Sequence, residues 1–232
     1  MNKIKIYHGS ERIIKHPDIT TGKKHNDYGQ GFYCTEDIEL AKEWACKNER
    51  DGFANGYELN LRDLKILHLN SDEYTILNWI AILLKNRVFS LDTPLSRNAR
   101  DYIIEHFGIN VEEYDVVIGY RADDSYFSFA DAFVSNSLSL SSLNKALRLG
   151  KLGEQVALVS QKAFDNLKYT ESVSADSKIY YPKFFSRDNN ARWIYHNEVM
   201  QNENVFDDIF VLDIIRQEMK NNDPRIQRIV SK

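Results

Sequence analysis

The hydrophobic and polar positions of this chain change their period several times, and each change predicts a new element. Residues 3–7 (KIKIY) alternate and are rich in β-forming side chains, so they predict a strand that ends at a His-Gly step. Residues 31–35 (GFYCT) predict a second short strand. An apolar face within residues 36–49 predicts a helix directly after it, with Thr35 as its N-cap.

Residues 16–31, which separate these two strands, show no periodic pattern. The segment contains Pro17, two aspartates, an asparagine and three glycines, which are residue types that favour turns. Most connections in compact domains are shorter, and long loops often carry or cover a functional site. We therefore expect residues 16–31 to cover a site.

The middle of the chain alternates between predicted strands and predicted helices. Residues 57–69 predict two strands after an Asn-Gly turn at 55–56, and residues 114–120 form an apolar run typical of a buried strand. Between them, residues 72–89 and 93–108 carry apolar stripes with helical spacing. These two helices predict a helical insert at about residues 72–108.

The last part of the chain is less regular. Helices are predicted over 121–135 and 139–153, followed by a late strand at 154–160 and a short helix capped by Ser160. Further along, the pattern predicts a strand at 177–185, a helix at 191–200 and an amphipathic helix at 207–220.

Separate groups of strands with helices between them predict an α+β fold, not the regular alternation of a parallel sheet. We expect one domain over residues 1–170 and a C-terminal extension over 171–232. The final amphipathic helix of the extension is expected to lie on the outside or to meet a partner.

Composition and charge narrow the class of protein. The chain has 43% hydrophobic and 28% charged residues and a net charge of −4, which is typical of a globular protein without an overall basic footprint for nucleic acid. The longest apolar run covers nine residues, so no membrane contact is expected. Two cysteines without a pairing framework and a start without a signal-peptide pattern favour a reduced, cytoplasmic protein.

Several common site motifs are missing. The segment GQGFYC has Cys34 where a dinucleotide-binding turn needs its third glycine, and it follows a loop instead of a strand. No Walker A run, H-E-x-x-H or paired C-x-x-C occurs, and the six histidines show no ligand spacing with the cysteines. No metal site is therefore expected.

Two residues remain as candidates, and each has an ordinary structural explanation. In the structural interpretation, His8 at the end of the first strand is a half-buried imidazole bonded to one backbone carbonyl. In the same interpretation, Tyr33 is a core aromatic residue with its hydroxyl at the surface. Neither residue alone indicates a function.

Taken together, the segments IYHGS and GQGFYCTEDIELAKEWA resemble the first two motifs of the ADP-ribosyltransferase superfamily, in its His-Tyr branch of diphtheria toxin and the poly(ADP-ribose) polymerases. The chain is more closely similar to a group of uncharacterised bacterial domains in that superfamily. They share YHGS, D-[FY]-G-x-G-F-Y-x-T, a YDVVIG strand with ADD, and a late Gln-hydrophobic strand before S/T-x-K-A. The resemblance covers residues 4 to about 168 and implies two packed antiparallel sheets around an NAD⁺ cleft.

The resemblance implies a role for each matched position. Gly9 would offer its backbone N–H and C=O to the nicotinamide carboxamide, which requires a residue without a side chain in the way. His8 would hydrogen-bond the adenosine-side ribose, and Ser10 would support the end of the strand. Tyr33 would stack on the nicotinamide ring, with Tyr28 as a second wall.

The third motif is a carboxylate or amide at the start of a late strand, which would hold the nicotinamide ribose. Here Glu154 and Gln155 are adjacent, and strand alternation points them to opposite faces, so only one can serve. The bacterial group places Gln155 in this position, whereas charge favours Glu154. If Gln155 faces inward, proton removal falls to the target or to another residue such as Asp123.

The segment RADD, residues 121–124, has two alternative interpretations. Arg121 would bind the pyrophosphate and Asp123 would reach the cleft mouth. Alternatively, Asp123 or Asp124 caps the next helix.

The function implied by the resemblance is mono-ADP-ribosyl transfer from NAD⁺ to a macromolecule, protein or nucleic acid. Relatives of this type are often intracellular toxins encoded beside a small neutralising protein, so an antitoxin partner is expected. The alternatives are NAD⁺ hydrolysis and a catalytically inactive NAD⁺- or ADP-ribose-binding or interaction module.

Overall fold

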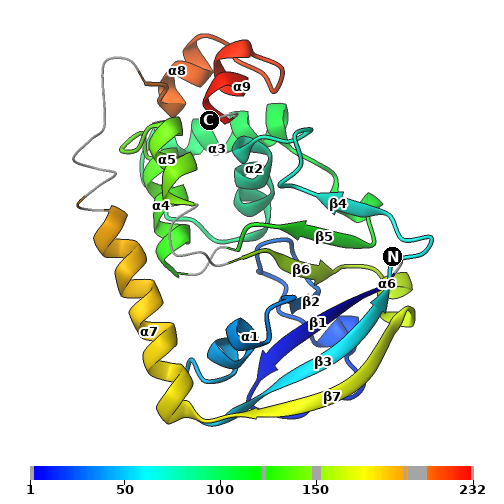
Figure 1. Cartoon of the computed structure of the whole chain (residues 1–232). Coiled ribbons are helices and arrows are strands. Elements are labelled where there is room, and N and C mark those ends of the chain that lie inside the picture. The colour runs from blue at the N-terminus through cyan, green and yellow to red at the C-terminus, as the bar shows by residue number, and fades with distance from the viewer. Residues whose placement is uncertain (1–2, 122–123, 148–152, 196, 198–207, 231–232) are drawn as a thin grey trace.

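The computed structural model describes residues 3–121, 124–147, 153–195, 197 and 208–230. Within these residues the chain is a mixed α+β structure with two separate β-sheets, as the sequence pattern predicts. Sheet strands occupy one half of the molecule in Figure 1, and most helices occupy the other half.

The first sheet, called sheet A, has the strand order β1-β3-β7 and is antiparallel throughout. The second sheet, called sheet B, has the order β2-β6-β5-β4. Its β4 and β5 strands are parallel, so the expectation of two purely antiparallel sheets is wrong. The reason is the helical insert, which supplies the long crossover that a parallel pair needs. The strands are β1 (Lys3–Ser10), β2 (Phe32–Cys34), β3 (Gly52–Asn60), β4 (Ile66–His68), β5 (Val116–Gly119), β6 (Gln155–Leu158) and β7 (Leu167–Ala175).

Helix α1 lies against sheet A, and α7 runs along one side of the molecule from sheet A towards the helical half (Figure 1). The other long helices gather on the far side of sheet B. The helices are η1 (Ile19–Thr21), α1 (Ile38–Ala45), α2 (Ile76–Asn86), α3 (Pro94–Phe107), η2 (Val111–Glu113), α4 (Asp124–Val134), α5 (Leu140–Ala146), α6 (Gln161–Asp165), α7 (Ser177–Ile194), α8 (Val211–Arg216) and α9 (Pro224–Val230).

Two hydrophobic cores lie on the two faces of sheet B. Ile6 of β1 and Phe32 of β2 belong to the core between the sheets. Trp79 of α2 and Phe133 of α4 belong to the larger core between sheet B and the helices. Because burial of apolar surface is the main stabilising term in folding, these two cores fix the position of sheet B.

A single backbone pair joins the two sheets. The N–H of Tyr7 donates to the carbonyl of Thr35 at 2.7 Å, and the N–H of Thr35 donates to the carbonyl of Tyr7 at 2.9 Å. Both strands are described over their whole length, and no further backbone pair joins β1 to β2. The two sheets therefore separate directly beyond Tyr7.

Most elements with a strong pattern are confirmed. The predicted helices at 72–89 and 93–108 are α2 and α3, and Pro94 and Gly108 mark the ends of α3 as expected. The apolar run at 114–120 contains β5, and the late strand at 154–160 contains β6.

The predicted Asn-Gly turn at 55–56 is wrong, because both residues lie inside β3. Asn55 is fully buried, and its side chain bonds to the backbone of Arg12 and Ile14 and to the hydroxyl of Ser172. Gly56 lies at an irregularity in the pairing with β7. The residue types usual in a turn are therefore used here to hold a neighbouring loop and a bulge.

The predicted cap of α1 is also wrong. Asp37, not Thr35, accepts hydrogen bonds from the N–H groups of Glu39 and Leu40. Thr35 pairs with Tyr7 through its backbone, and its hydroxyl accepts from the N–H of Asp37. The chain thus leaves sheet B before the helix begins.

The predicted tail differs most from the structure. Residue 170 lies inside β7, so a boundary at 170 cuts sheet A. The predicted strand at 177–185 is part of helix α7 despite its aromatic residues and Pro182. Arg187 of α7 holds Glu43 of α1 with two hydrogen bonds of 2.9 and 2.6 Å, so tertiary contacts outweigh local β propensity.

The predicted amphipathic helix at 207–220 is shorter than expected. Helix α8 ends at Arg216, and Glu218 adopts a positive φ of 50°. Val211 and Ile214 are fully buried in the core of the helical half. The C-terminal segment therefore belongs to this core and does not lie on the outside.

Candidate functional site

His8 lies near the end of β1 and faces sheet B. Its Nδ1 lies 2.7 Å from the carbonyl oxygen of Tyr33, and its ring stacks on Phe32 with centroids 4.3 Å apart. A carbonyl oxygen only accepts hydrogen bonds, so Nδ1 carries the proton and the neutral ring presents Nε2 as an acceptor. Among the described residues, none bonds to Nε2.

The charge state of His8 follows from its surroundings. Burial lowers the pKa of the imidazole below its usual value of 6.5. The hydrogen bond to Tyr33 opposes this effect, and the nearby charge of Lys47 lowers the pKa further. At neutral pH the ring is therefore uncharged, and Nε2 is suited to accept a hydrogen bond from a hydroxyl group.

This pKa shift predicts a pH dependence of stability. Below pH 6.5 the unfolded chain protonates His8 while the folded chain does not, so the stability due to the neutral ring is lost as pH falls through the folded pKa. We expect the free energy of unfolding of the wild type, minus that of His8→Asn, to be flat above pH 7.5 and to fall below 6.5 by at most about 1.4 kcal/mol per pH unit. Urea unfolding between pH 5 and 8 measures this difference, and a difference that rises on acidification would contradict the assignment.

Gly9 and Tyr33 lie where the two sheets separate. In an antiparallel ladder, hydrogen-bonded pairs recur every second residue, so the pair after Tyr7 and Thr35 would join Gly9 to Tyr33. This pair is not made, because the His8 ring takes the Tyr33 carbonyl. The N–H and C=O of Gly9 therefore face the opening between the strands, on the edge of β1 that points away from β3.

The missing side chain of Gly9 has a structural reason that the sequence did not indicate. A Cβ at this position would lie 2.1 Å from the carbonyl oxygen of Ala41 and 2.8 Å from the nitrogen of Ala45, both in α1. The close approach of the helix therefore already requires glycine at this position. What Gly9 directs into the opening is its peptide group.

Tyr33 is held rigidly by the loop before it. Its hydroxyl donates to the carbonyl of Gly29 at 2.6 Å and accepts from the N–H of Tyr28 at 3.0 Å. The ring of Tyr28 is parallel to that of Tyr33 within 10°, with centroids 6.3 Å apart. For a third ring to stack between Tyr28 and Tyr33, their two rings would have to be about 7 Å apart. No ring therefore fits between them at the observed separation.

Tyr28 is placed behind Tyr33. It is only 3% exposed, its hydroxyl donates to the carbonyl of Tyr120 at 2.5 Å, and burial raises its pKa well above the usual value. Burial also raises the pKa of Tyr33, so both phenols stay neutral. Tyr28 therefore supports Tyr33 and does not form a second exposed wall.

The two candidates for the third position have separate places. Gln155 is buried, and its Nε2 lies 2.9 Å from Oδ2 of Asp27. Glu154 points to the opposite face, where its Oε1 bonds to His68 at 3.0 Å and Asn70 at 2.7 Å. Of the two, only Gln155 lies with the residues around Tyr28.

Ser10 serves the backbone beyond the strand. Its Oγ donates to the carbonyl of Arg12 and accepts from Nδ2 of Asn55 at 3.0 Å. These bonds tie the end of β1 to the following loop.

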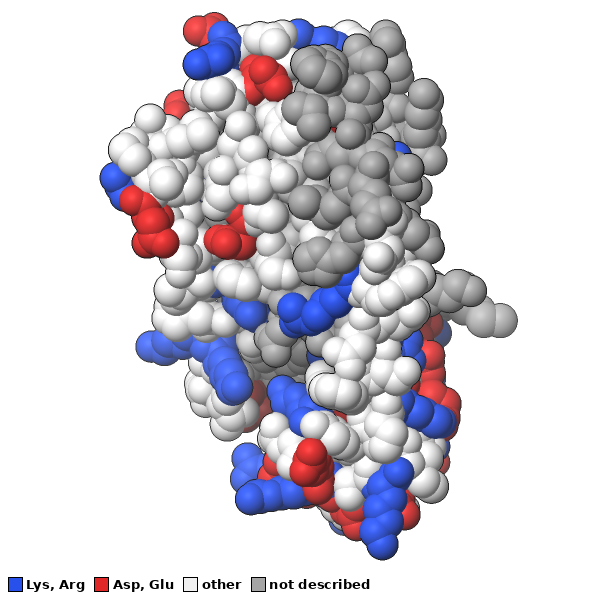
Figure 2. Space-filling model, turned by 90° about the vertical axis from the view of Figure 1, so that its left-hand side faces the viewer, with Lys and Arg blue, Asp and Glu red and all other residues white. Residues whose placement is uncertain are grey.

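Arg121 lies over the ring of Trp44, whose Cβ is close to Gly9. The guanidinium of Arg121 lies 4.1 Å from the centroid of the Trp44 ring, and Trp44 Cβ lies 2.9 Å from where a Cβ of Gly9 would be. In the described part of the chain, no acceptor reaches the buried Nε1 of Trp44. Asp123 lies outside the described residues. Figure 2 shows Lys and Arg side chains around a hollow on the face along which α7 runs.

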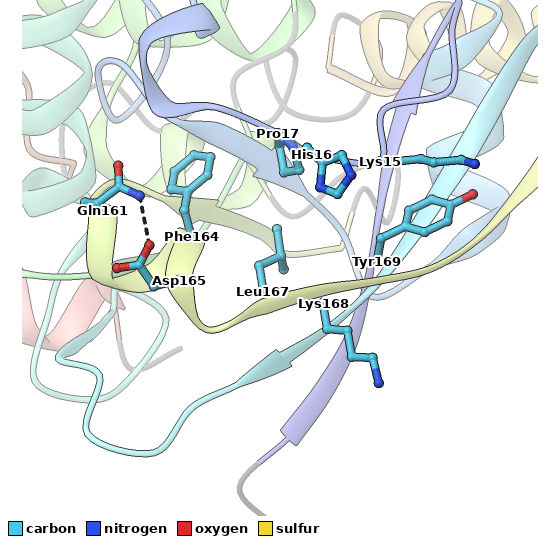
Figure 3. A pocket seen from close by; sticks show the side chains of 9 residues that line it. All are labelled: Lys15, His16, Pro17, Gln161, Phe164, Asp165, Leu167, Lys168 and Tyr169. Carbon is cyan, nitrogen blue, oxygen red and sulfur yellow. Dashed lines mark hydrogen bonds between the residues drawn. The ribbon is translucent and has the colours of Figure 1, made fainter.

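A different pocket of about 520 Å³ opens between the loop at 15–17, α6 and the start of β7 (Figure 3). Phe164, Pro17 and Leu167 point towards its centre, while Lys15 and Lys168 point away. None of the residues predicted for the site lines this pocket.

Sequence reasoning missed Asp27, Arg87 and Trp44. Asp27 is 5% exposed and its Oδ1 lies 3.1 Å from Nη1 of Arg87. Its partners Arg87 and Gln155 are 60 and 128 residues away in the chain, so no local spacing connects them. The only signal was that Asp27 opens the segment DYGQGFYCT.

The fold and the site together define an α+β protein in which a histidine, a glycine peptide and a tyrosine meet where two sheets separate. Residues 4–169 match a family described as a protein of unknown function (DUF3990), and the chain belongs to this family. No curated protein and no solved structure matches the chain.

No described helix is both long and apolar enough to cross a bilayer. No group of three or more His, Cys, Asp or Glu side chains in the described ranges is arranged to hold a metal ion.

Proposed function

We propose that the chain is an NAD-dependent mono-ADP-ribosyltransferase that modifies a macromolecular target. One observation carries the proposal: the ladder between β1 and β2 stops at Gly9 because His8 takes the carbonyl of Tyr33. This leaves a peptide N–H, a peptide C=O and the Nε2 acceptor of His8 at one opening.

The opening complements the nicotinamide half of NAD⁺. A carboxamide has one carbonyl acceptor and one amine donor, which match the N–H and C=O of Gly9. In this proposal the rigid ring of Tyr33 offers an apolar face for the pyridine ring. Trp44, whose Cβ lies beside Gly9 and whose indole carries Arg121, is its second aromatic neighbour. In this proposal the nicotinamide lies against these aromatic side chains, with its carboxamide on Gly9.

The remaining polar groups suit the rest of the dinucleotide. Nε2 of His8 accepts a hydrogen bond from a ribose hydroxyl, and the bond from Nδ1 to Tyr33 keeps the ring in that orientation. Lys47 lies near enough to affect the pKa of His8, and Arg121 is held over Trp44. In the proposal these two cations balance the pyrophosphate charge.

The proposed chemistry needs little acid-base help at the leaving group. The bond between the ribose C1′ and the nicotinamide nitrogen breaks, its electron pair stays on the nitrogen, and neutral nicotinamide departs. Positive charge then grows on the ribose ring, which an acceptor group such as the amide oxygen of Gln155 stabilises. The target nucleophile forms the new bond to C1′ and releases its proton to solvent.

Labelled NAD⁺ incubated with bacterial lysate tests the proposal. We expect nicotinamide release together with label on a macromolecule, at a rate above that of His8→Asn. Free ADP-ribose without labelled macromolecule would favour NAD⁺ hydrolysis instead. If neither product forms, the proposed activity is wrong and a binding module becomes the better explanation.

Within this proposal the protein acts in the cytoplasm as a toxin that a small partner protein neutralises. Induced expression of the wild type is then expected to arrest growth, while His8→Asn allows it. Equal growth arrest by both proteins would contradict the proposed link between NAD⁺ chemistry and toxicity.

A further inference from the structure

Gln155, Asp27 and Arg87 form a buried polar chain beside Tyr28. Gln155 is 4% exposed and Asp27 is 5% exposed. Nε2 of Gln155 lies 2.9 Å from Oδ2 of Asp27 and 3.2 Å from the carbonyl oxygen of Tyr120. Arg87 reaches the other carboxylate oxygen of Asp27 at 3.1 Å.

These contacts fix which way the Gln155 amide points. The carboxylate of Asp27 and the carbonyl of Tyr120 only accept hydrogen bonds, so the amide group that faces both of them must be the NH₂. The oxygen Oε1 therefore points away from them. In the described ranges no donor bonds to Oε1. This oxygen is also absent from the fully buried side-chain atoms that lack a hydrogen-bond partner, so it is not closed off from a ligand.

We propose that Asp27 is a positioning residue: its charge locks the Gln155 amide so that this position of the site offers a neutral acceptor, and a glutamate is excluded there. The ligand of Oε1, a ribose hydroxyl, rests on the proposed function. The lock itself does not, because it follows from contacts within the protein.

The exclusion of glutamate has a simple electrostatic cause. In Gln155→Glu a second carboxylate would stand about 3 Å from Oδ2 of Asp27, whose other carboxylate oxygen is paired with Arg87. Like charges at this distance, removed from water, cannot both stay ionised without a large cost. A carboxylate at position 155, which charge considerations alone would favour, is therefore destabilising unless Asp27 is neutralised.

A double-mutant cycle on stability tests the lock without any substrate. The proteins are the wild type, Asp27→Asn, Gln155→Glu and the double variant, unfolded in urea at pH 8 and pH 5. We expect Gln155→Glu to raise the unfolding equilibrium constant by about 100-fold at pH 8 and by much less at pH 5, where one carboxyl takes a proton. Asp27→Asn in the same chain should remove most of this effect. Strictly additive effects at pH 8 would overturn the proposal.

Nicotinamide release tests the consequence for the site. We expect Asp27→Asn to lower kcat by about 10-fold with a smaller change in KM, because the freed amide no longer keeps its oxygen in place. Gln155→Glu should lower kcat further. The double variant should recover part of kcat, and its kcat should fall at acidic pH, where the introduced carboxylate takes a proton. A wild-type kcat for Asp27→Asn would overturn the positioning role.

Asp115→Asn is the matched control. The Asp115 side chain is 13% exposed, accepts hydrogen bonds from Lys65 and Ser160, and lies 3.7 Å from the charge of Lys162. Its loss is expected to lower stability and leave kcat unchanged. If the wild type releases no nicotinamide, the proposed function fails, while the stability cycle still decides whether Asp27 locks Gln155.

Discussion

A His8→Asn protein is expected to fold like the wild type and to lose about 10- to 100-fold in kcat/KM for NAD⁺ cleavage. The asparagine amide can still donate to the carbonyl of Tyr33, as Nδ1 of His8 does at 2.7 Å. It has no second acceptor at the place of Nε2, so the hydrogen bond to a ribose hydroxyl is lost. Nicotinamide release at several NAD⁺ concentrations measures the change.

His8→Ala separates the structural part of the role from the ligand part. It removes the ring that stacks on Phe32 and the donor to Tyr33 together, so we expect a loss of stability in addition to the loss of activity. His16→Ala is the control, because His16 is exposed and lines the separate pocket of Figure 3. If His8→Asn kept the activity of the wild type, Nε2 would have no part in the reaction.

Elements with a strong local pattern could be predicted from the sequence. The stripe of α2 and the Pro and Gly boundaries of α3 specify helices by spacing and backbone chemistry alone. Elements that depend on distant partners could not be predicted in this way. Helix α7 has aromatic residues typical of a strand, and its contacts with α1 across 144 residues outweigh them.

The candidate site shows the same limit. Sequence placed His8, Gly9 and Tyr33 at strand ends, and the structure brings these strand ends together. The choice between Glu154 and Gln155 depends on which face of β6 meets Asp27, and strand alternation shows only that the two differ. A further reason for glycine at position 9 was missed, because no local pattern reveals that a helix backbone approaches it.

Gly9→Ala is expected to destabilise the fold strongly, although it adds a single carbon. The new Cβ would lie 2.1 Å from the carbonyl oxygen of Ala41 and 2.8 Å from the nitrogen of Ala45. Neither contact can relax by a side-chain rotation, because both atoms belong to the backbone of α1. The helix must therefore shift by about 1 Å to restore ordinary contact distances.

Helix α1 resists such a shift at both ends. Asp37 caps its first turn, and the buried carboxylate of Glu43 is held by Arg187 of α7 at 2.6 Å. Forced overpacking of this kind costs about 1–3 kcal/mol or more, which exceeds the 0.4–1 kcal/mol that replacing glycine saves in the unfolded chain. We expect urea unfolding to show a net loss of about 2 kcal/mol, with weaker NAD⁺ binding because Trp44 moves with the helix.

Gly153→Ala is the matched control for this prediction. Among the residues that the structure describes, a Cβ on Gly153 would meet nothing closer than Leu40 Cδ2 at 4.0 Å, but its φ of 66° lies in the left-handed region. The control therefore reports backbone strain alone, about 1–2 kcal/mol, without moving α1 or Trp44. Unchanged NAD⁺ affinity in Gly153→Ala together with weakened affinity in Gly9→Ala would show that the loss of affinity comes from the shift of α1 and Trp44. A Gly9→Ala protein as stable as the wild type would show that α1 is free to move away from β1, and the opening beside Gly9 would then be wider than this fold describes.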